Sequence, residues 1–433
     1  MSRVQRFAIL TLLTASITAP VCAQSTATDA PTVPQLLAPS AVPENQIDLF
    51  YAARNQAPIW LKDEDGRAAA QSLVSILRSA TLDGLSDGPE LAGKVETAIA
   101  ANEDKTISAA WVRYVQALKG PVEGVTYGDP DLAPKAPSAG AILAAAAREA
   151  SLSARVKAVS SVNPFYSQLR DEAVKAGNSS DPRIRATLAR LSLIPANGRV
   201  ILVDIPAAKL MMIEDGRIVD SMKVIVGKPS GATPVLASTI HYVTFNPVWH
   251  IPQDIARVRV APVVLKRGVG YLKLARYQTV ESFGAANETP IDPTTVDWKA
   301  VADGTSNVYV RQLSGPQNMM GKMKFGFANG TGVFLHDTPD KKLFAKDKRY
   351  LSHGCIRLER PAALASWLLG PNAPQPSGEP EELVPVKGGV PIYLSYLTAQ
   401  PGADGTIAYA NDPYGLDTPG APKAVMATPA TAQ

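Results

Sequence analysis

Apolar residues recur at helical spacing through the first part of the chain, from Glu44 to about Ser192. The spacing is clearest in segments 68–80, 107–118 and 141–150, the last of them rich in alanine. Asp181 precedes Pro182, which places a capping residue before a proline at the first helical position, so a further helix is predicted over 183–193. Histidine and cysteine are absent from this stretch and its acidic residues are scattered. The pattern predicts a helical scaffold rather than a reaction centre.

The pattern changes at Gly198 to short runs rich in Val, Ile and Met, separated by Gly and Pro. Glu214-Asp215-Gly216 is a hairpin signal between two of these runs. Strands are predicted at 199–205, 209–213, 218–226, 239–245, 306–312, 323–327, 332–335 and 391–397. Many short strands indicate a β-sandwich or barrel. Residues 252–300 interrupt the rhythm with mixed helical and irregular sequence, and we expect this insertion to form a lid over a cleft.

The two ends differ in composition from the rest of the chain. Arg3 and Arg6 precede an apolar run over 7–17, and Val21-Cys22-Ala23 offers a cleavage site, so residues 1–23 are predicted to be a secretory signal peptide. A retained membrane anchor and a lipid anchor on Cys22 are the alternatives, although Val21 fits a lipoprotein cleavage site poorly. Residues 24–43 are rich in Ala, Thr, Pro and Ser and predict a flexible linker.

These patterns predict an α+β, multidomain protein. A helical scaffold domain spans 44–197, and a mainly-β catalytic domain spans 198–400 with a lid at about 252–300. A C-terminal extension follows over 401–433, and its Pro- and Ala-rich tail is predicted to be disordered from about residue 418.

Charge and cysteine content then narrow the function. Removal of Arg3 and Arg6 leaves 41 basic and 39 acidic residues, so the net charge falls from +4 to +2, which gives no electrostatic basis for nucleic-acid binding. No transmembrane segment is expected after cleavage. Loss of Cys22 leaves Cys355 as the single cysteine, and an unpaired thiol in an exported protein suggests a chemical role.

The sequence around Cys355 offers the groups that acyl transfer requires. His336 ends a predicted strand nineteen residues earlier, and an imidazole there could accept the thiol proton, lower the thiol pKa and hold a thiolate as an ion pair. Gly354 permits a tight turn that could aim the N–H groups of Cys355 and its neighbours at one point, as an oxyanion hole. Arg357 adds positive charge and could bind a substrate carboxylate. Ser352 and His353 complete this candidate site.

Other interpretations of the same residues stay open at this point. A lone cysteine is often a small buried hydrophobic residue. His336, His353 and Cys355 could form a three-ligand zinc site, although Ser352-His353-Gly354-Cys355 is tight for two ligands. His241 alternates with strand residues and is predicted to be structural, and His250 to be structural or to line a cleft.

The combination of His336 with Ser352-His353-Gly354-Cys355-Ile356-Arg357-Leu358 resembles the signature of the L,D-transpeptidase (YkuD-type) catalytic domain. Further blocks match that family: 224–229, Thr233-Pro234, 246–252, 311–325 and 336–339. Together with 392–399 near the end, they resemble the large, scaffold-bearing, YcbB-like subgroup. The helical region joins the resemblance through Phe50-Tyr51, Arg54, Pro58, Trp60 and Asp83-Gly84-Leu85.

The resemblance implies a function and roles for these residues. Cys355 would attack the carbonyl before the terminal D-alanine of a peptidoglycan tetrapeptide stem, with His336 as general base. His353 and Gly354 would shape the oxyanion hole, and Arg357 would orient the donor or the loop. D-Alanine would leave, and the diaminopimelate amine of a second stem would resolve the thioester into a 3→3 cross-link. The resemblance implies that this reaction requires no cofactor and no metal, and that it takes place in the periplasm. It also implies that carbapenems acylate Cys355 and that other cell-wall enzymes could be partners.

Two alternatives and one departure accompany this interpretation. Water as acceptor would make the protein an L,D-carboxypeptidase, and a lysine amine would make it a murein–protein ligase or hydrolase. A catalytically silent murein-binding scaffold belongs to another class, and the intact His336, Gly354, Cys355 and Arg357 argue against it. Many members insert a peptidoglycan-binding domain into the scaffold, and the stretch from Tyr166 to Arg183 is too short to hold one.

Overall fold

The computed structural model describes residues 44–284, 288–371, 373, 376–402 and 404–426. The predicted signal peptide, the linker and residues 427–433 lie outside the described residues. Within the described part, none of the helices is both long and apolar enough to cross a membrane.

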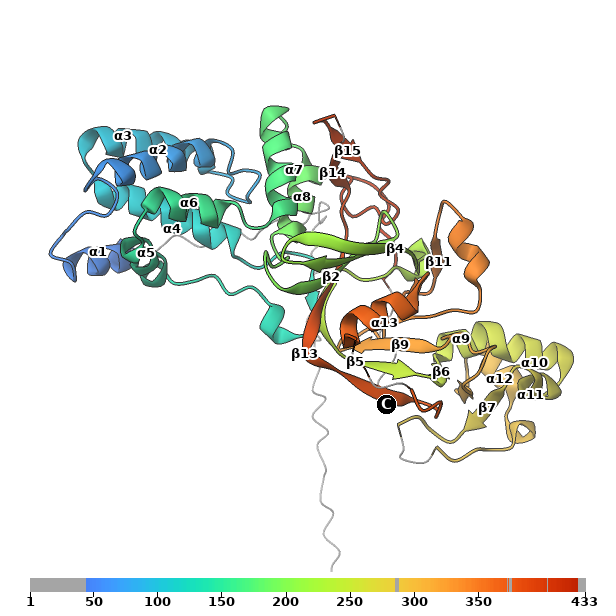
Figure 1. Cartoon of the computed structure of the whole chain (residues 1–433). Helices are drawn as coiled ribbons and strands as arrows, with labels where there is room; N and C mark the ends of the chain where they lie inside the picture. Colours follow the sequence, from blue (N-terminus) through green and yellow to red (C-terminus); the bar gives the residue numbers. More distant parts are fainter. Residues whose placement is uncertain (1–43, 285–287, 372, 374–375, 403, 427–433) are drawn as a thin grey trace, which may run out of the picture. The chain divides into compact units, whose positions relative to one another are not determined.

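The helical region has eight α-helices among the residues described (Figure 1): α1 (Glu44–Ala52), α2 (Glu64–Arg78), α3 (Gly88–Ala101), α4 (Asp104–Leu118), α5 (Ala139–Arg148), α6 (Leu152–Ser160), α7 (Pro164–Lys175) and α8 (Pro182–Leu191). α2 buries Leu73 and Leu77 on one face, and it contacts α3 and α6. The capping prediction for α8 is confirmed, because the Asp181 carboxylate accepts from the N–H of Arg183 at 2.8 Å, with Pro182 at the first turn.

Two acidic residues, Asp104, which is half-buried, and Asp83, which is buried, hold the loops between these helices. Asp104 accepts hydrogen bonds from three consecutive backbone N–H groups, those of Ile59, Trp60 and Leu61, at 2.8–2.9 Å. Asp83 has no exposed side-chain surface and forms an ion pair with Arg170 at 2.6 Å. The acids that look scattered in the sequence therefore stabilise the scaffold, since a buried carboxylate must be paired or hydrogen-bonded.

The β-rich region is built on a closed sheet. Its ring runs β5-β13-β2-β3-β4-β12-β10-β9, and β9 pairs back with β5. The bounds are β2 (Arg199–Asp204), β3 (Lys209–Glu214), β4 (Arg217–Gly227), β5 (Leu236–Phe245), β9 (Met323–Phe327), β10 (Leu335–His336), β12 (Ile356–Leu358) and β13 (Glu382–Ser395). The β13–β2 and β10–β12 pairs are parallel, and the other pairs in the ring are antiparallel. The structure is therefore a mixed barrel, one of the two predicted architectures.

Short elements complete this region. They are β1 (Thr126–Tyr127), the 3₁₀ turns η1 (Pro130–Leu132), η2 (Pro229–Gly231) and η5 (Lys341–Ala345), β11 (Tyr350–Ser352), α13 (Pro361–Leu369), β14 (Ala399–Pro401) and β15 (Ile407–Tyr409). β1 pairs with β5, β11 with β4, and β14 with β15. The predicted hairpin between β3 and β4 is present, with positive φ at both Asp215 (48°) and Gly216 (73°).

The packing of strand β2 explains why its sequence is hydrophobic at nearly every position. Ile201 and Val203 belong to the core inside the barrel, to which α13 contributes Leu364. Val200 and Leu202, on the opposite face, belong to the core that the helical region shares. A strand that is buried on both faces shows a continuous apolar run instead of alternation.

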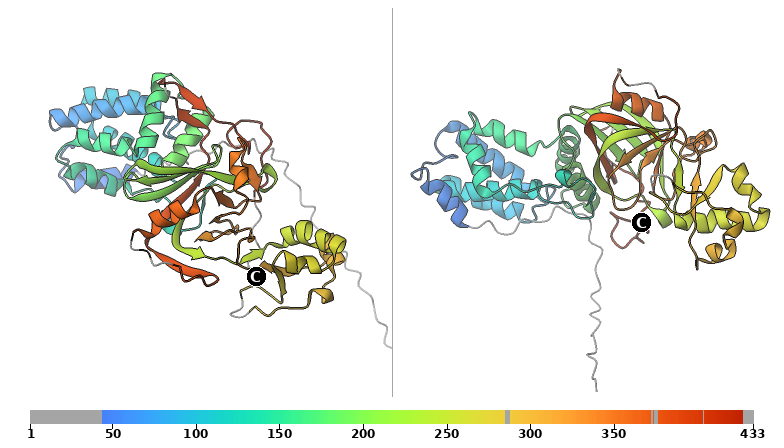
Figure 2. Two further views of the ribbon diagram at one scale, coloured as in Figure 1. Left: turned by 45° about the vertical axis from the view of Figure 1, so that its right-hand side comes forward. Right: turned by 90° about the horizontal axis from the view of Figure 1, so that it is seen from below.

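The insertion is a module with its own core. It comprises β6 (Trp249–Ile251), α9 (Gln253–Ile255), the π-helical turn η3 (Ala256–Val260), α10 (Ala261–Arg267), α11 (Gly270–Leu274), β7 (Tyr277–Val280), the 3₁₀ turn η4 (Pro293–Thr295), α12 (Trp298–Asp303) and β8 (Tyr309–Gln312). Its strands form a separate sheet in the order β6-β8-β7, and its helices gather on that sheet in both views of Figure 2. Because β6 and β8 frame it, this inserted module (residues 249–312) is wider than the predicted 252–300.

One prediction about the end of the chain needs correction. Residues 418–426 are not a disordered tail, because the Val425 N–H donates to Pro229 O and the Val425 carbonyl accepts from the Ala232 N–H, both at 2.8 Å. His241, which was predicted to be structural, is exposed on β5. His250 does have a structural role, as its Nε2 lies 2.8 Å from the Glu288 carboxylate, which also pairs with Arg311.

Candidate active site

The predicted site residues Ser352 to Arg357 form one tight turn between β11 and β12, which we call the catalytic turn (residues 352–357). Gly354 has a φ of 125°, a conformation that other residues rarely adopt, so the turn requires glycine there. The Ser352 hydroxyl closes the turn, since it donates to the Cys355 carbonyl at 2.6 Å and accepts from the Gly354 N–H at 3.2 Å. Cys355 is half-buried at the start of β12.

His336 is brought to this turn by strand pairing. β10 runs parallel to β12 with His336 opposite Arg357, so the histidine lies beside the strand that begins immediately after Cys355. The His336 Nδ1 lies 2.5 Å from the Asp337 carbonyl oxygen. A carbonyl oxygen only accepts, so Nδ1 carries the proton and Nε2 has a free lone pair. This tautomer can act as a base.

The expected thiolate–imidazolium ion pair is not the resting state of this site. Burial, followed by the positive charge of Arg357, lowers the pKa of His336 to about 3. Burial also raises the pKa of the Cys355 thiol, and this outweighs the opposite effects of the Phe334 backbone, Arg357 and Lys324. Both groups are therefore neutral near pH 7, because desolvation disfavours the charged form of each.

The backbone N–H groups of the catalytic turn differ in whether they already donate a hydrogen bond within the protein. The Gly354 N–H already donates to the Ser352 hydroxyl, at 3.2 Å. The N–H groups of His353 and Cys355 have no hydrogen-bond partner among the described residues. An attacking cysteine whose own N–H is unpaired can stabilise the oxyanion that forms on its substrate.

A metal centre has no support in this geometry. Across the described residues, no group of three or more His, Cys, Asp and Glu side chains could hold a metal ion. The zinc alternative therefore lacks a ligand set here.

Comparisons with known proteins find matches to both the helical and the β-rich region. Residues 198–394 match the model of the L,D-transpeptidase catalytic domain, and residues 45–172 match that of the Scaffold domain. A curated protein of Haemophilus influenzae, whose name assigns it to the L,D-transpeptidases, is 27% identical over 385 residues, which is 85% of this chain and 77% of that protein.

The chain carries an L,D-transpeptidase catalytic domain together with a Scaffold domain. Solved L,D-transpeptidases are also similar to it. The enzyme of Mycobacterium smegmatis is 17% identical with a TM-score of 0.24, and the match covers 46% of this chain and 58% of that one. L,D-transpeptidase 3 of Mycobacterium tuberculosis, solved with a faropenem-derived adduct, has the same identity and TM-score, with 46% and 60% covered. Each match spans less than two thirds of the solved chain.

Positive charges act on the thiol and on the catalytic turn, and the sequence analysis identified only one of them, Arg357. Besides Arg357, Lys324 and Lys228 act on the catalytic turn, and Lys228 helps to lower the pKa of His353, for which burial is the largest cause. Arg259, on η3 of the inserted module, also acts on His353 and Arg357. It was missed because nothing in its sequence context connects residue 259 to residues 353–357.

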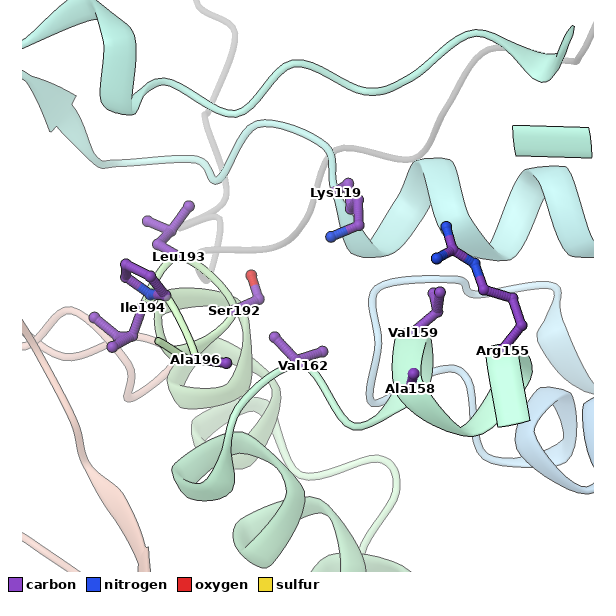
Figure 3. A pocket seen from close by; sticks show the side chains of 10 residues that line it. Lys119, Arg155, Ala158, Val159, Val162, Ser192, Leu193, Ile194 and Ala196 are labelled. Atoms are coloured by element: carbon purple, nitrogen blue, oxygen red, sulfur yellow. The ribbon is translucent and has the colours of Figure 1, made fainter. Parts of the chain in front are cut away.

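A cavity of about 400 Å³ lies away from this site, in the helical region (Figure 3). Its walls are Lys119, Arg155, Ala158, Val159, Val162, Ser192, Leu193, Ile194, Pro195 and Ala196. It has no cysteine, histidine or acid in its lining, so it cannot supply the nucleophile and base of acyl transfer.

Proposed function

We propose that this enzyme is a peptidoglycan L,D-transpeptidase that forms 3→3 cross-links through a thioester on Cys355. The observation that carries the proposal is the β10–β12 pairing, which places a neutral His336 with a free Nε2 beside the strand of a cysteine whose own N–H is unpaired. Those are the base, nucleophile and oxyanion donor that two-step covalent catalysis needs.

In the first step, His336 Nε2 accepts the thiol proton as Cys355 Sγ attacks the carbonyl carbon before the terminal D-alanine of a tetrapeptide stem. The carbonyl oxygen becomes an oxyanion that the Cys355 N–H stabilises. When the C–N bond breaks, the His336 imidazolium returns the proton to the amine of the departing D-alanine, and a thioester remains. Proton transfer accompanies attack because the resting thiol and imidazole are both neutral.

In the second step, the diaminopimelate amine of a neighbouring stem attacks the thioester. His336 takes a proton from that amine, the C–S bond breaks, and the proton passes to the leaving thiolate. The new amide is the cross-link, and the enzyme returns to its neutral resting state.

Electrostatics of the site favour a donor of this class. The catalytic turn carries Arg357, and Lys324, Lys228 and Arg259 add the electrostatic effect of further positive charges. A stem peptide ends in a carboxylate and carries others along its length, so this positive charge raises its local concentration. We place the reaction in the periplasm, which the signal-peptide pattern of residues 1–23 supports.

Incubation with disaccharide tetrapeptides, followed by mass spectrometry of products and of intact protein, tests the proposal. The expected products are a cross-linked dimer and free D-alanine, and a carbapenem should add its mass to Cys355. The Cys355→Ala variant should give neither. Tripeptide without dimer would indicate a carboxypeptidase, and identical behaviour of wild type and Cys355→Ala would indicate a silent binding scaffold.

A further inference from the structure

Thr233 makes the contact that fixes the catalytic turn from outside. Its side chain is fully buried, and its hydroxyl donates to the Gly354 carbonyl at 2.7 Å. The same hydroxyl accepts from the Gly227 N–H at 2.9 Å. The loop that carries Thr233 (the support loop, residues 227–233) is tightly packed, because a Cβ on Gly227 would lie 2.2 Å from the Gly231 carbonyl oxygen.

The geometry of the peptide bond gives this contact a consequence. The Gly354 carbonyl and the Cys355 N–H belong to one planar trans peptide, so they point in opposite directions. A hydrogen bond that holds the carbonyl therefore also sets the direction of the N–H. Because the Cys355 N–H has no partner of its own in the described structure, Thr233 is the group that aims it.

The support loop is itself held by the C-terminal segment (residues 404–426). The Tyr414 hydroxyl donates to the Gly227 carbonyl at 2.6 Å and accepts from the Thr233 N–H at 3.3 Å, so it joins the two ends of the loop. Tyr414 is fully buried, and its ring stacks on Tyr396 with centroids 5.5 Å apart. Backbone bonds of Val425 to Pro229 and Ala232 hold the loop from another point.

We propose that Thr233 and Tyr414 are positioning residues that orient the Cys355 N–H as the oxyanion donor, and that the C-terminal segment is thereby part of the catalytic apparatus. Tyr414 lies beyond residues 198–394, which the catalytic-domain model covers. The inference rests on the proposed acyl-transfer function, and it adds the element that prepares the site for it.

Two reactions of the Cys355 sulfur distinguish a misdirected oxyanion donor from a general loss of structure at the site. Acylation by a carbapenem passes through an oxyanion, whereas alkylation by iodoacetamide does not. Tyr414→Phe, which removes one oxygen, should slow acylation about 10-fold or more, and Thr233→Val about 100-fold, in the range expected for a misdirected oxyanion donor. Thr233→Ser, which keeps the hydroxyl, should recover most of the rate. Alkylation rates of all three should stay within about twofold of wild type.

The matched control is Tyr166→Phe in the scaffold, where a buried tyrosine hydroxyl donates to Asp83. The Tyr166→Phe variant should lower the melting temperature without changing the ratio of the carbapenem acylation rate to the iodoacetamide alkylation rate. Acylation of Tyr414→Phe or Thr233→Val at the wild-type rate would overturn the proposal, and so would a parallel fall of acylation and alkylation. If wild-type protein itself is acylated by neither carbapenem nor tetrapeptide, the proposed function fails and takes this inference with it.

Discussion

Burial sets the charge of both reacting groups before substrate arrives. His336 is 5% exposed and faces Arg357 in the neighbouring strand, so its imidazolium form is penalised twice. The positive charges of Arg357 and Lys324 favour the Cys355 thiolate, yet desolvation outweighs them and raises the thiol pKa. The resting thiol is therefore protonated near pH 7, and the proposed mechanism requires a general base to remove its proton during attack.

The neutral pair predicts two different pH profiles. Alkylation by iodoacetamide requires free thiolate, so its rate should rise about tenfold per pH unit from pH 5 up to the raised thiol pKa, with no plateau near neutrality. Carbapenem acylation needs a neutral His336, whose pKa is about 3, so its rate should change little between pH 5 and 7 and fall towards pH 3. Stopped-flow measurement of both rates checks this, with Cys355→Ala as the background. An alkylation rate independent of pH between 5 and 8 would instead indicate an ion pair.

The sequence singled out His336 and Cys355 as candidate base and nucleophile because both residue types are rare in the chain. Cys355 is the single cysteine outside the predicted signal peptide and the chain has four histidines, so few combinations exist, and the spacing of His336 and Cys355 resembles a known signature. Thr233 and Tyr414 could not be found that way, since they are common residue types whose partners lie 121 and 187 residues away. The direction of the thiol pKa was wrong for a related reason, because burial is a property of the folded site.

At the scale of elements, the inserted module contributes the positive charge of Arg259 to the candidate site, whose other residues lie on or beside strands of the barrel. Arg259 is exposed on η3 and acts on both His353 and Arg357. An arginine that binds a donor carboxylate equally in the ground and transition states should affect binding rather than turnover.

Arg259→Gln should therefore raise KM for the tetrapeptide about tenfold, with kcat nearly unchanged. It should also weaken the dependence of KM on ionic strength, because one screened charge is lost. Steady-state kinetics at two salt concentrations measure both effects. Arg257→Gln is the matched control, since Arg257 is exposed on the same turn and lies against Gly304. Equal effects of the two variants would show that Arg259 has no specific role.

A second element-scale feature is the junction of α8 with the C-terminal segment. Arg190 and Asp417 are 2% and 0% exposed, and two nitrogens of the guanidinium bond the two carboxylate oxygens at 2.7–2.8 Å. Arg190→Ala should lower the free energy of unfolding by about 3–5 kcal/mol, because it leaves a buried carboxylate without its charge partner. The exposed pair Lys299–Asp303 is the control, and Lys299→Ala should cost about 0–1 kcal/mol. Denaturant titrations compare them, and equal losses would contradict the assigned role.

Sequence periodicity located several helices and strands, whereas the two short strands that flank the catalytic turn were not predicted. Helices α2, α4, α5 and α8 and strands β2 to β5 appear where periodicity places them, since each has enough residues to show a pattern. β11 and β12 have three residues each, too few for periodicity, although they carry the catalytic turn. The predicted strand over 332–335 shrinks to β10, Leu335–His336, because residues 332–334 make no ladder pairing.

In the described molecule as a whole, the division into separate hydrophobic cores determines which regions can unfold locally as one unit. One core fills the barrel, and a second joins the helical region to the outer faces of β2 and β3. The inserted module has a third core, with members such as Leu272, Trp298 and Val310. A module with a separate core can open without exposing the barrel, as a lid requires.

This separation predicts the effect of two matched cavity variants. Leu272→Ala in the module and Leu210→Ala in the barrel each remove a buried leucine side chain, 3% and 0% exposed, and each should cost about 2–5 kcal/mol locally. Hydrogen–deuterium exchange should then show faster exchange across residues 249–284 and 288–312 in Leu272→Ala, with the barrel strands unchanged. In Leu210→Ala, exchange should accelerate throughout the barrel. If Leu272→Ala instead loosens β2, β3 and β4 as much as the module, the module and barrel unfold as one unit, and access to Cys355 cannot be controlled by the module alone.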